Sequence, residues 1–169
     1  GIVSHFWERF GATRPTFIVV EPEQADCLYQ SALQGRPARA SGNVDSVMAG
    51  LACGETSPLA WRFLLPVADF FVTVADPLAE ESMRILAEGR HGDIPVIAGE
   101  SGVAGLAALR VMMANSAWRL PAGLGSSSRV LLISTEGATA PNVYARIVGD
   151  TEENVLVAQN RWLEAHGMP

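Results

Sequence analysis

The sequence predicts an α/β fold in which a mostly parallel sheet of about four strands is covered by helices on both faces. Four short apolar runs, at 17–20, 70–74, 96–98 and 130–133, lack the polar alternation of half-exposed strands. Segments with helix signals separate these runs, and strands that alternate with helices are typical of a parallel sheet. The length of 169 residues fits one α/β unit over the whole sequence, 1–169.

The first part of the chain predicts a helix, a strand and a second helix. Apolar residues recur at helical spacing in 1–10, yet Gly1 supplies no capping side chain, so we expect the sequence to begin inside a longer protein. The β-branched run 17–20 indicates the first strand. Pro22 is expected to open a helix that ends before Gly35, with acidic residues in its first turn.

Two short helices and the second strand are expected next. Residues 44–53 predict a short helix that ends at Gly54. Ser57 and Pro58 supply an N-cap and a first helical residue for another helix. The run 70–74 then indicates the second buried strand.

The middle of the chain contains the clearest helix signals. Asp76 and Pro77 indicate the start of a helix that we expect to continue to Gly89. The third strand, 96–98, passes through a glycine-rich turn into a helix at 103–113. This helix is apolar nearly all round and carries several small residues, so we expect it to be buried against close neighbours.

The turn between the third strand and this helix is the expected place of a site. In open α/β sheets, ligands bind beyond the carboxyl ends of strands, where the next helix presents unpaired N–H groups. Glu100 and Ser101 lie at that place in the sequence.

The last part of the chain predicts a loop, a strand and two helices. Residues 117–129 are rich in glycine and serine and are expected to form a loop. The run 130–133 indicates the fourth strand. Pro141 begins a short helix, and Thr151 caps a final helix with apolar residues along one side.

Charge and hydropathy narrow the classes of partner. The net charge is −6 and the pI is about 5.0, which disfavours nucleic acid and an anionic membrane surface. No apolar run approaches the roughly 18 residues of a membrane span, and no signal peptide is recognisable. We therefore expect a cytoplasmic protein whose partners are small molecules or proteins.

The cysteines, the histidines and the absence of lysine limit which disulfides, metal sites and lysine-dependent reactions we expect. Cys27 and Cys53 are expected to be reduced, small core residues rather than a disulfide, and the scattered histidines indicate no metal site. All twelve basic residues are arginine, so the sequence contains no lysine.

Five segments of the sequence resemble a known enzyme family. They are SVMAGLACGETSPLAW at 46–61, VLLISTEG at 130–137, IVVEP at 18–22, ADC at 25–27 and GESG at 99–102. In order and spacing they resemble the diaminopropionate ammonia-lyases of the tryptophan-synthase-β and threonine-dehydratase family, which use pyridoxal phosphate. The resemblance reaches about residue 148. Residues 150–169 match less clearly, and Ala138 and Ala140 stand where that family often has acidic residues.

The resemblance implies the C-terminal part of a larger two-domain enzyme of fold type II, which binds pyridoxal phosphate between its domains. Such an enzyme converts 2,3-diaminopropionate into pyruvate and ammonia by α,β-elimination. Its members hold the cofactor as a Schiff base on a lysine and cradle its phosphate in a glycine-rich loop, both expected upstream of Gly1. Because this chain has no lysine, we expect it to be inactive by itself, and we expect the enzyme to be a homodimer.

The resemblance also implies contacts with the cofactor. Ser134, or Thr135 beside it, matches a position where the family places a hydroxyl against the pyridine nitrogen. A neutral hydroxyl does not fully protonate that nitrogen, so the ring is a weaker electron sink and departure of the leaving group is favoured. The alternative is a serine that only satisfies a turn.

Two further segments match positions beside the cofactor ring. Glu100 matches a position near the ring in tryptophan synthase, and its alternative role is to stabilise the N-terminus of the next helix. Gly50, Leu51 and Ala52 match a segment whose backbone passes the ring edge, and their alternative role is a helix end. No residue of this chain matches the family's general base.

Two other classes of function are open. The segment GESG at 99–102 is similar to the nucleophile elbow of serine hydrolases, and Asp150 and His166 follow Ser101 in the chain order of their catalytic triad. However, Val103 stands where the elbow needs its second glycine. The chain is alternatively a non-catalytic remnant that associates through apolar surface.

Overall fold

The fold was analysed in a computed structural model, which describes residues 1–168. In chain order its helices and strands are α1 (Ile2–Phe10), β1 (Ile18–Pro22), α2 (Cys27–Gln34), α3 (Pro58–Leu64), β2 (Phe70–Val74), α4 (Asp76–Glu88), α5 (Ala104–Ala114), α6 (Ser116–Arg119), α7 (Pro141–Val148) and α8 (Glu152–Ala165). Short 3₁₀ turns lie at Gly11–Thr13, Ala49–Leu51 and Arg90–Gly92.

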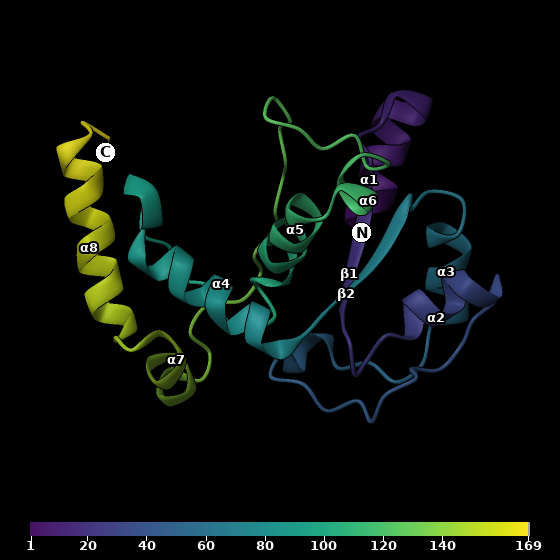
Figure 1. Ribbon diagram of the computed structural model, residues 1–169, viewed down its shortest axis with the longest axis horizontal. Coiled ribbons are helices and arrows are strands. Elements are labelled where there is room, and N and C mark those ends of the chain that lie inside the picture. Colours follow the sequence, from purple (N-terminus) through teal and green to yellow (C-terminus); the bar gives the residue numbers. More distant parts are fainter. Residues whose placement is uncertain (169) are drawn as a thin grey trace.

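The sheet lies between helices on both faces. β1 and β2 run parallel, with Ile18 opposite Phe70. α5 packs on one side of the pair, while α2 and α3 lie on the other side (Figure 1). The ring of Phe71 meets Trp61 of α3 with centroids 5.9 Å apart, whereas the neighbouring Val72 packs against the core on the opposite face. The predicted α/β class with a parallel sheet is therefore confirmed.

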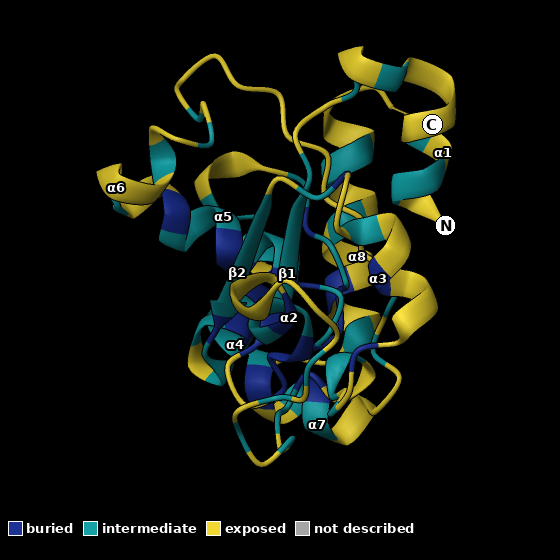
Figure 2. Ribbon diagram, turned by 90° about the vertical axis from the view of Figure 1, so that its right-hand side faces the viewer, coloured by how far each residue is buried: buried dark blue, intermediate teal, exposed yellow. Residues whose placement is uncertain are grey.

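The third and fourth predicted strands are not formed in residues 1–168, where β1 and β2 alone make up the sheet. The N–H of Val96 donates to the carbonyl of Leu86 at the end of α4, 2.8 Å away, instead of to a strand. In 130–133 every residue is at least 42% exposed, and the coil that follows α6 is exposed over most of its length (Figure 2). An apolar run becomes a strand only where a neighbouring strand pairs with its backbone. In the described residues these two runs have no such neighbour.

Two helix predictions for the first third of the chain are wrong. Residues 44–53 form no α-helix, because Asn43 Oδ1 accepts the N–H of Asp45 at 3.0 Å and Ser46 Oγ accepts the N–H of Met48 at 3.1 Å. Such local side-chain bonds offer the backbone an alternative to helix. Pro22 ends β1 instead of opening a helix, and α2 begins only at Cys27.

The helices predicted from capping signals are confirmed. α3 begins at Pro58, and Ser57 Oγ accepts the N–H of Ala60 at 3.4 Å. α4 starts at Asp76. α8 is capped by Thr151. The predicted loop 117–129 differs only at its start, which belongs to the short helix α6.

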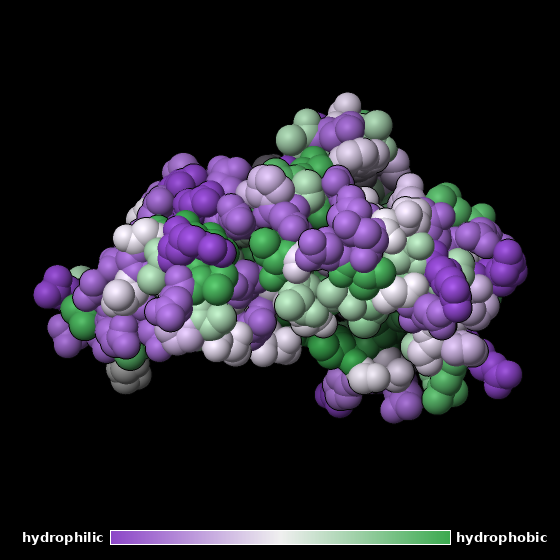
Figure 3. Space-filling model, turned by 90° about the horizontal axis from the view of Figure 1, so that it is seen from below, coloured by the Kyte–Doolittle hydropathy of each residue, from purple (hydrophilic) through white to green (hydrophobic). Residues whose placement is uncertain are grey.

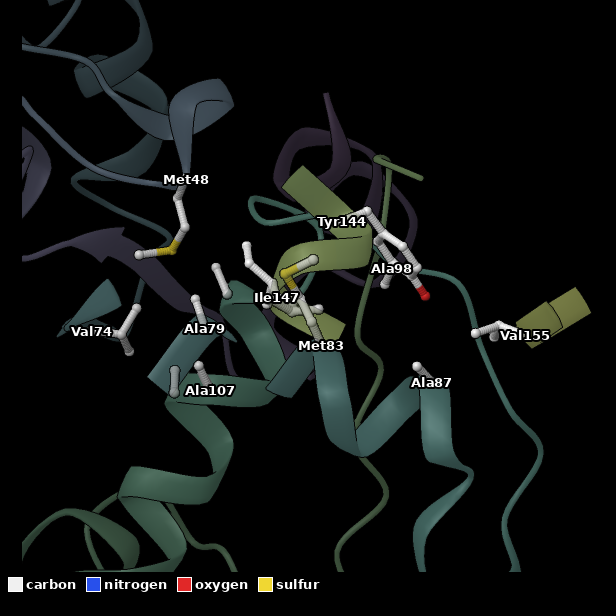
Figure 4. Packing of buried hydrophobic residues seen from close by; sticks show 13 residues of the cluster. Met48, Val74, Ala79, Met83, Ala87, Ala98, Ala107, Tyr144, Ile147 and Val155 are labelled. Atoms are coloured by element: carbon white, nitrogen blue, oxygen red, sulfur yellow. The ribbon is translucent and has the colours of Figure 1, made fainter. Parts of the chain in front are cut away.

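The core lies where α4 packs against α5 and α7, and where α5 packs against the sheet. Ala104, Ala107 and Ala108 of α5 are buried, so this helix can approach both strands and α4 closely, as its small residues predicted. Met83 of α4 and Ile147 of α7 meet in the same cluster (Figure 4). This packing fixes the N-terminal end of α5 relative to the loops that follow the strands.

The surface of the molecule carries both hydrophilic and apolar regions. Seen from below, the end of the molecule formed by α8 is mostly hydrophilic, and apolar atoms gather near the middle (Figure 3). Within residues 1–168 no helix combines the length and the apolar character needed to cross a membrane.

Candidate functional site

Three segments that are far apart in the sequence meet at the N-terminal end of α5. The N–H of Gly50 donates to Ser101 Oγ at 3.0 Å, and the N–H of Gly99 donates to the carbonyl of Glu136 at 2.9 Å. These bonds bring together the segments that contain the predicted site residues, namely 50–52, 99–102 and 134–137.

Glu136 is a residue of this site that the sequence did not reveal. Its Oε2 accepts the N–H of Ser101 at 2.5 Å and the N–H of Gly102 at 3.2 Å. A carboxylate in this place satisfies backbone donors ahead of α5 and interacts favourably with the helix dipole. No local spacing signals such a contact, because the partners lie in different elements.

Gly102 permits the close approach of Ser134. A β-carbon at position 102 would stand 2.6 Å from Ser134 Oγ and 2.9 Å from the carbonyl oxygen of Glu136. A β-carbon at Gly50 would likewise stand 2.9 Å from Ser101 Oγ. Glycine is therefore required by the contacts of this site, and not only by its turn.

The predicted ring-nitrogen partner carries a weakly engaged hydroxyl. Ser134 is exposed, and its Oγ donates to the carbonyl oxygen of Glu136 over 3.4 Å, which is long for a hydroxyl hydrogen bond. Thr135 beside it is exposed as well. The hydroxyl of Ser134 can therefore donate its hydrogen bond to a better acceptor, because little free energy is lost when the long bond to Glu136 is broken.

The other predicted residues lie at the same end of α5. Glu100 is only 7% exposed and belongs to the turn ahead of the helix. Leu51 is half-buried and packs against the core, and Ala52 is also half-buried. Gly50 is exposed, and its N–H is the group bonded to Ser101 Oγ. The structure thus places all of these residues around one turn.

Two carboxylates, the half-buried Asp76 and the buried Glu21, hold the neighbouring loops. Asp76, just after β2, accepts the hydroxyl of Ser46 at 2.7 Å and the N–H of Val47 at 3.0 Å, which anchors the segment leading to Gly50. Glu21, near the end of β1, accepts the N–H groups of α2 in the same way. Burial raises the pKa of Glu21, and those amide bonds oppose the rise.

The residues of the hydrolase hypothesis are bonded elsewhere. Ser101 Oγ accepts from Gly50, whereas the His166 ring pairs with the carbonyl of Trp162 at 2.8 Å. Asp150 accepts from Asn154 Nδ2 at 2.6 Å. No hydrogen-bonded Ser–His–Asp arrangement joins them in the described part of the chain.

The cysteines are both free, and only one has the predicted environment. Cys27 is buried, as expected, but Cys53 is exposed, so the prediction of a core residue is wrong there. Among residues 1–168 no three His, Cys, Asp or Glu side chains are grouped so that they could hold a metal ion.

Comparison with known proteins gives a family match over most of the chain. The family described as pyridoxal-phosphate dependent enzyme matches residues 1–136. Diaminopropionate ammonia-lyase of Salmonella typhimurium is 42% identical over 153 residues, which are 87% of this chain and 38% of the relative.

Solved structures of the Escherichia coli diaminopropionate ammonia-lyase are also similar. The complex with D-serine is 33% identical, with a TM-score of 0.75, and the match covers 88% of this chain and 37% of that one. The complex with an aminoacrylate–PLP azomethine reaction intermediate is 37% identical, with a TM-score of 0.67, over 78% of this chain and 33% of that one. This chain spans about two fifths of the relatives' length. The chain belongs to the family of pyridoxal-phosphate dependent enzymes.

Proposed function

We propose that this chain supplies one side of the cofactor cleft in an ammonia-lyase that acts on 2,3-diaminopropionate. The observation that carries the proposal is the meeting of Gly50–Ala52, Glu100, Ser134 and Thr135 at one end of α5, in a chain that is 42% identical to a diaminopropionate ammonia-lyase. These residues are called the cofactor face below.

The chemistry of the cofactor face fits the pyridine ring of pyridoxal phosphate. The ring nitrogen needs a hydrogen-bond donor, and the hydroxyl of Ser134 has only a long bond to its present acceptor. A flat ring also needs accessible backbone that carries little side-chain bulk, and the exposed Gly50 offers such backbone. The chain has no lysine, so the fit extends to the ring and not to covalent attachment.

Ser134 suits an elimination. When bound, pyridoxal phosphate supplies an electron sink that stabilises the carbanion left by loss of the α-proton. The neutral hydroxyl of Ser134 would hydrogen-bond the ring nitrogen without fully protonating it, which would favour departure of the β-amine of 2,3-diaminopropionate. With one molecule of water, the overall reaction would give pyruvate and two molecules of ammonia. The lysine and the general base must come from sequence outside this chain.

An activity assay of the chain tests the proposal. Addition of pyridoxal phosphate is expected to give no absorbance band of a lysine-bound cofactor, and no ammonia from 2,3-diaminopropionate, because the reactive amine is lacking. Ammonia release above a cofactor-only control would contradict the proposed division of residues.

A role in association is a second candidate. Val130–Ile133 presents a run of exposed apolar side chains, with Leu131 70% exposed. Large apolar patches mark interfaces in most proteins. A second copy of the chain in a homodimer is the proposed occupant, and the size of the chain in solution tests it.

A further inference from the structure

Glu136 connects the parts of the cofactor face through both its side chain and its backbone. The carboxylate accepts the N–H groups of Ser101 and Gly102, and the carbonyl oxygen accepts from Gly99 and, over 3.4 Å, from Ser134 Oγ. The turn ahead of α5 and the segment that carries Ser134 are therefore bonded through one residue.

The connection leaves little freedom for the residues that it joins. The close contact of Gly102 with Ser134 means that a displaced turn would displace the hydroxyl. The same turn carries Ser101, whose Oγ accepts from Gly50. Hydrogen bonds to an ionised acceptor are stronger than neutral ones, so the Glu136 carboxylate is the strongest of these links.

We infer that Glu136 is a positioning residue, which holds Ser134, the turn 99–102 and Gly50 at a fixed separation. An effect of Glu136 on cofactor binding rests on the proposed function, because the residues that Glu136 positions belong to the cofactor face. Glu136 itself acts through its neighbours and needs no contact with the ring.

Amide hydrogen exchange in the 169-residue chain tests the inference without any cofactor. Glu136→Ala removes the acceptor, so exchange at Ser101 and Gly102 is expected to become at least about tenfold faster. Glu136→Gln keeps an acceptor oxygen and is expected to stay within about threefold of the wild type. Glu164→Ala, at an exposed position on α8, is the control for loss of one negative charge. Unchanged exchange in Glu136→Ala would overturn the inference.

Binding of pyridoxamine 5′-phosphate provides the second measurement, because this probe cannot form an imine with the N-terminal amine. Glu136→Ala is expected to raise the Kd at least about fivefold, and Glu136→Gln is expected to restore it. Ser134→Ala should weaken binding without faster exchange at Ser101. Faster exchange in Glu136→Ala with no binding by the wild type would support the inference and contradict the proposed function. An unchanged Kd in Glu136→Ala would overturn the role of Glu136 toward the cofactor.

Discussion

Gly102 lies directly against the hydroxyl of Ser134, since a β-carbon at position 102 would stand 2.6 Å from Ser134 Oγ. The turn ahead of α5 and the segment after 130–133 are thereby packed as one unit. The two residues also share a partner, because Glu136 accepts from both. A substitution at Gly102 or at Glu136 should therefore displace the hydroxyl of Ser134.

Gly102→Ala is expected to lower the free energy of unfolding by about 1–3 kcal/mol, because the added methyl group overpacks a tight contact. Urea unfolding of the chain measures the effect. Gly105→Ala is the matched control, since its β-carbon would meet only the end of the Leu132 side chain at 3.3 Å. In the interior of α5 that change should raise stability by roughly 0.5–1 kcal/mol. Equal effects of the two substitutions would contradict the close packing of Gly102.

Ser134→Ala, made in a longer lysine-containing enzyme that includes this sequence, is expected to slow elimination while covalent attachment of the cofactor is retained. Loss of one neutral hydrogen bond of about 1 kcal/mol corresponds to about a fivefold lower kcat/KM. Steady-state ammonia release and the absorbance of the bound cofactor measure the two quantities. Ser134→Thr, which keeps a hydroxyl, is the control, and an unchanged rate in Ser134→Ala would remove Ser134 from the site.

The ion pair between Arg14 and Asp69 predicts a pH dependence of stability. The guanidinium contacts both carboxylate oxygens, at 2.6 and 3.0 Å, and its hydrogen bond lowers the pKa of Asp69. A lowered pKa in the folded state stabilises the fold above the unfolded value of about 3.9, and this contribution is lost as pH falls through the folded value. Asp69→Asn should therefore be less stable than the wild type at neutral pH.

Urea unfolding across a pH series tests this prediction. The difference between Asp69→Asn and the wild type should shrink below about pH 3.9. The exposed Glu164→Gln is the control and should show no comparable trend. A difference that is the same at pH 7 and at pH 3 would show that the ion pair is not its source.

The exposed run 130–133 predicts self-association. Light scattering is expected to give a mass above the 18.0 kDa of one chain, which rises with concentration. Leu131→Ser should reduce it, whereas Leu33→Ser, at a 67% exposed position on α2, should not. A wild-type chain that stays monomeric at all concentrations would argue against an interface at this run.

Local signals predicted the fold well where they decide the structure locally. Asp76 with Pro77, Ser57 with Pro58, and Thr151 each predicted a helix start that is present. Ser57 and Thr151 form capping bonds to near neighbours in the sequence, and Pro77 has the backbone angle of a first helical turn. The run 70–74 also has the predicted bounds, and it pairs with β1.

Local sequence signals could not show whether 96–98 and 130–133 form strands. Their apolar composition is that of buried strands, but a strand also needs a paired neighbour, and composition does not say whether one is present. Similarly, the short polar side chains around Ser46 bind nearby amides and prevent the helix predicted for 44–53.

The sequence likewise predicted some residues of the candidate site and missed one that depends on contacts between distant segments. Glu100 was expected from its place ahead of a buried helix, and the family resemblance suggested Gly50 and Ser134, which the structure places close by. Glu136 was missed, because its contacts with Ser101 and Gly102 arise only when two distant segments meet. No pattern of spacing encodes such a meeting.

Mapping of a cofactor analogue onto the chain by NMR tests the central proposal most directly. Pyridoxamine 5′-phosphate, titrated into the ¹⁵N-labelled chain, is expected to shift the amide signals of Gly50–Ala52, Glu100, Ser134 and Thr135 together, with one common Kd. Shifts confined to other parts of the surface, or no shifts at millimolar concentrations of the analogue, would contradict the assignment of these residues to the cofactor face.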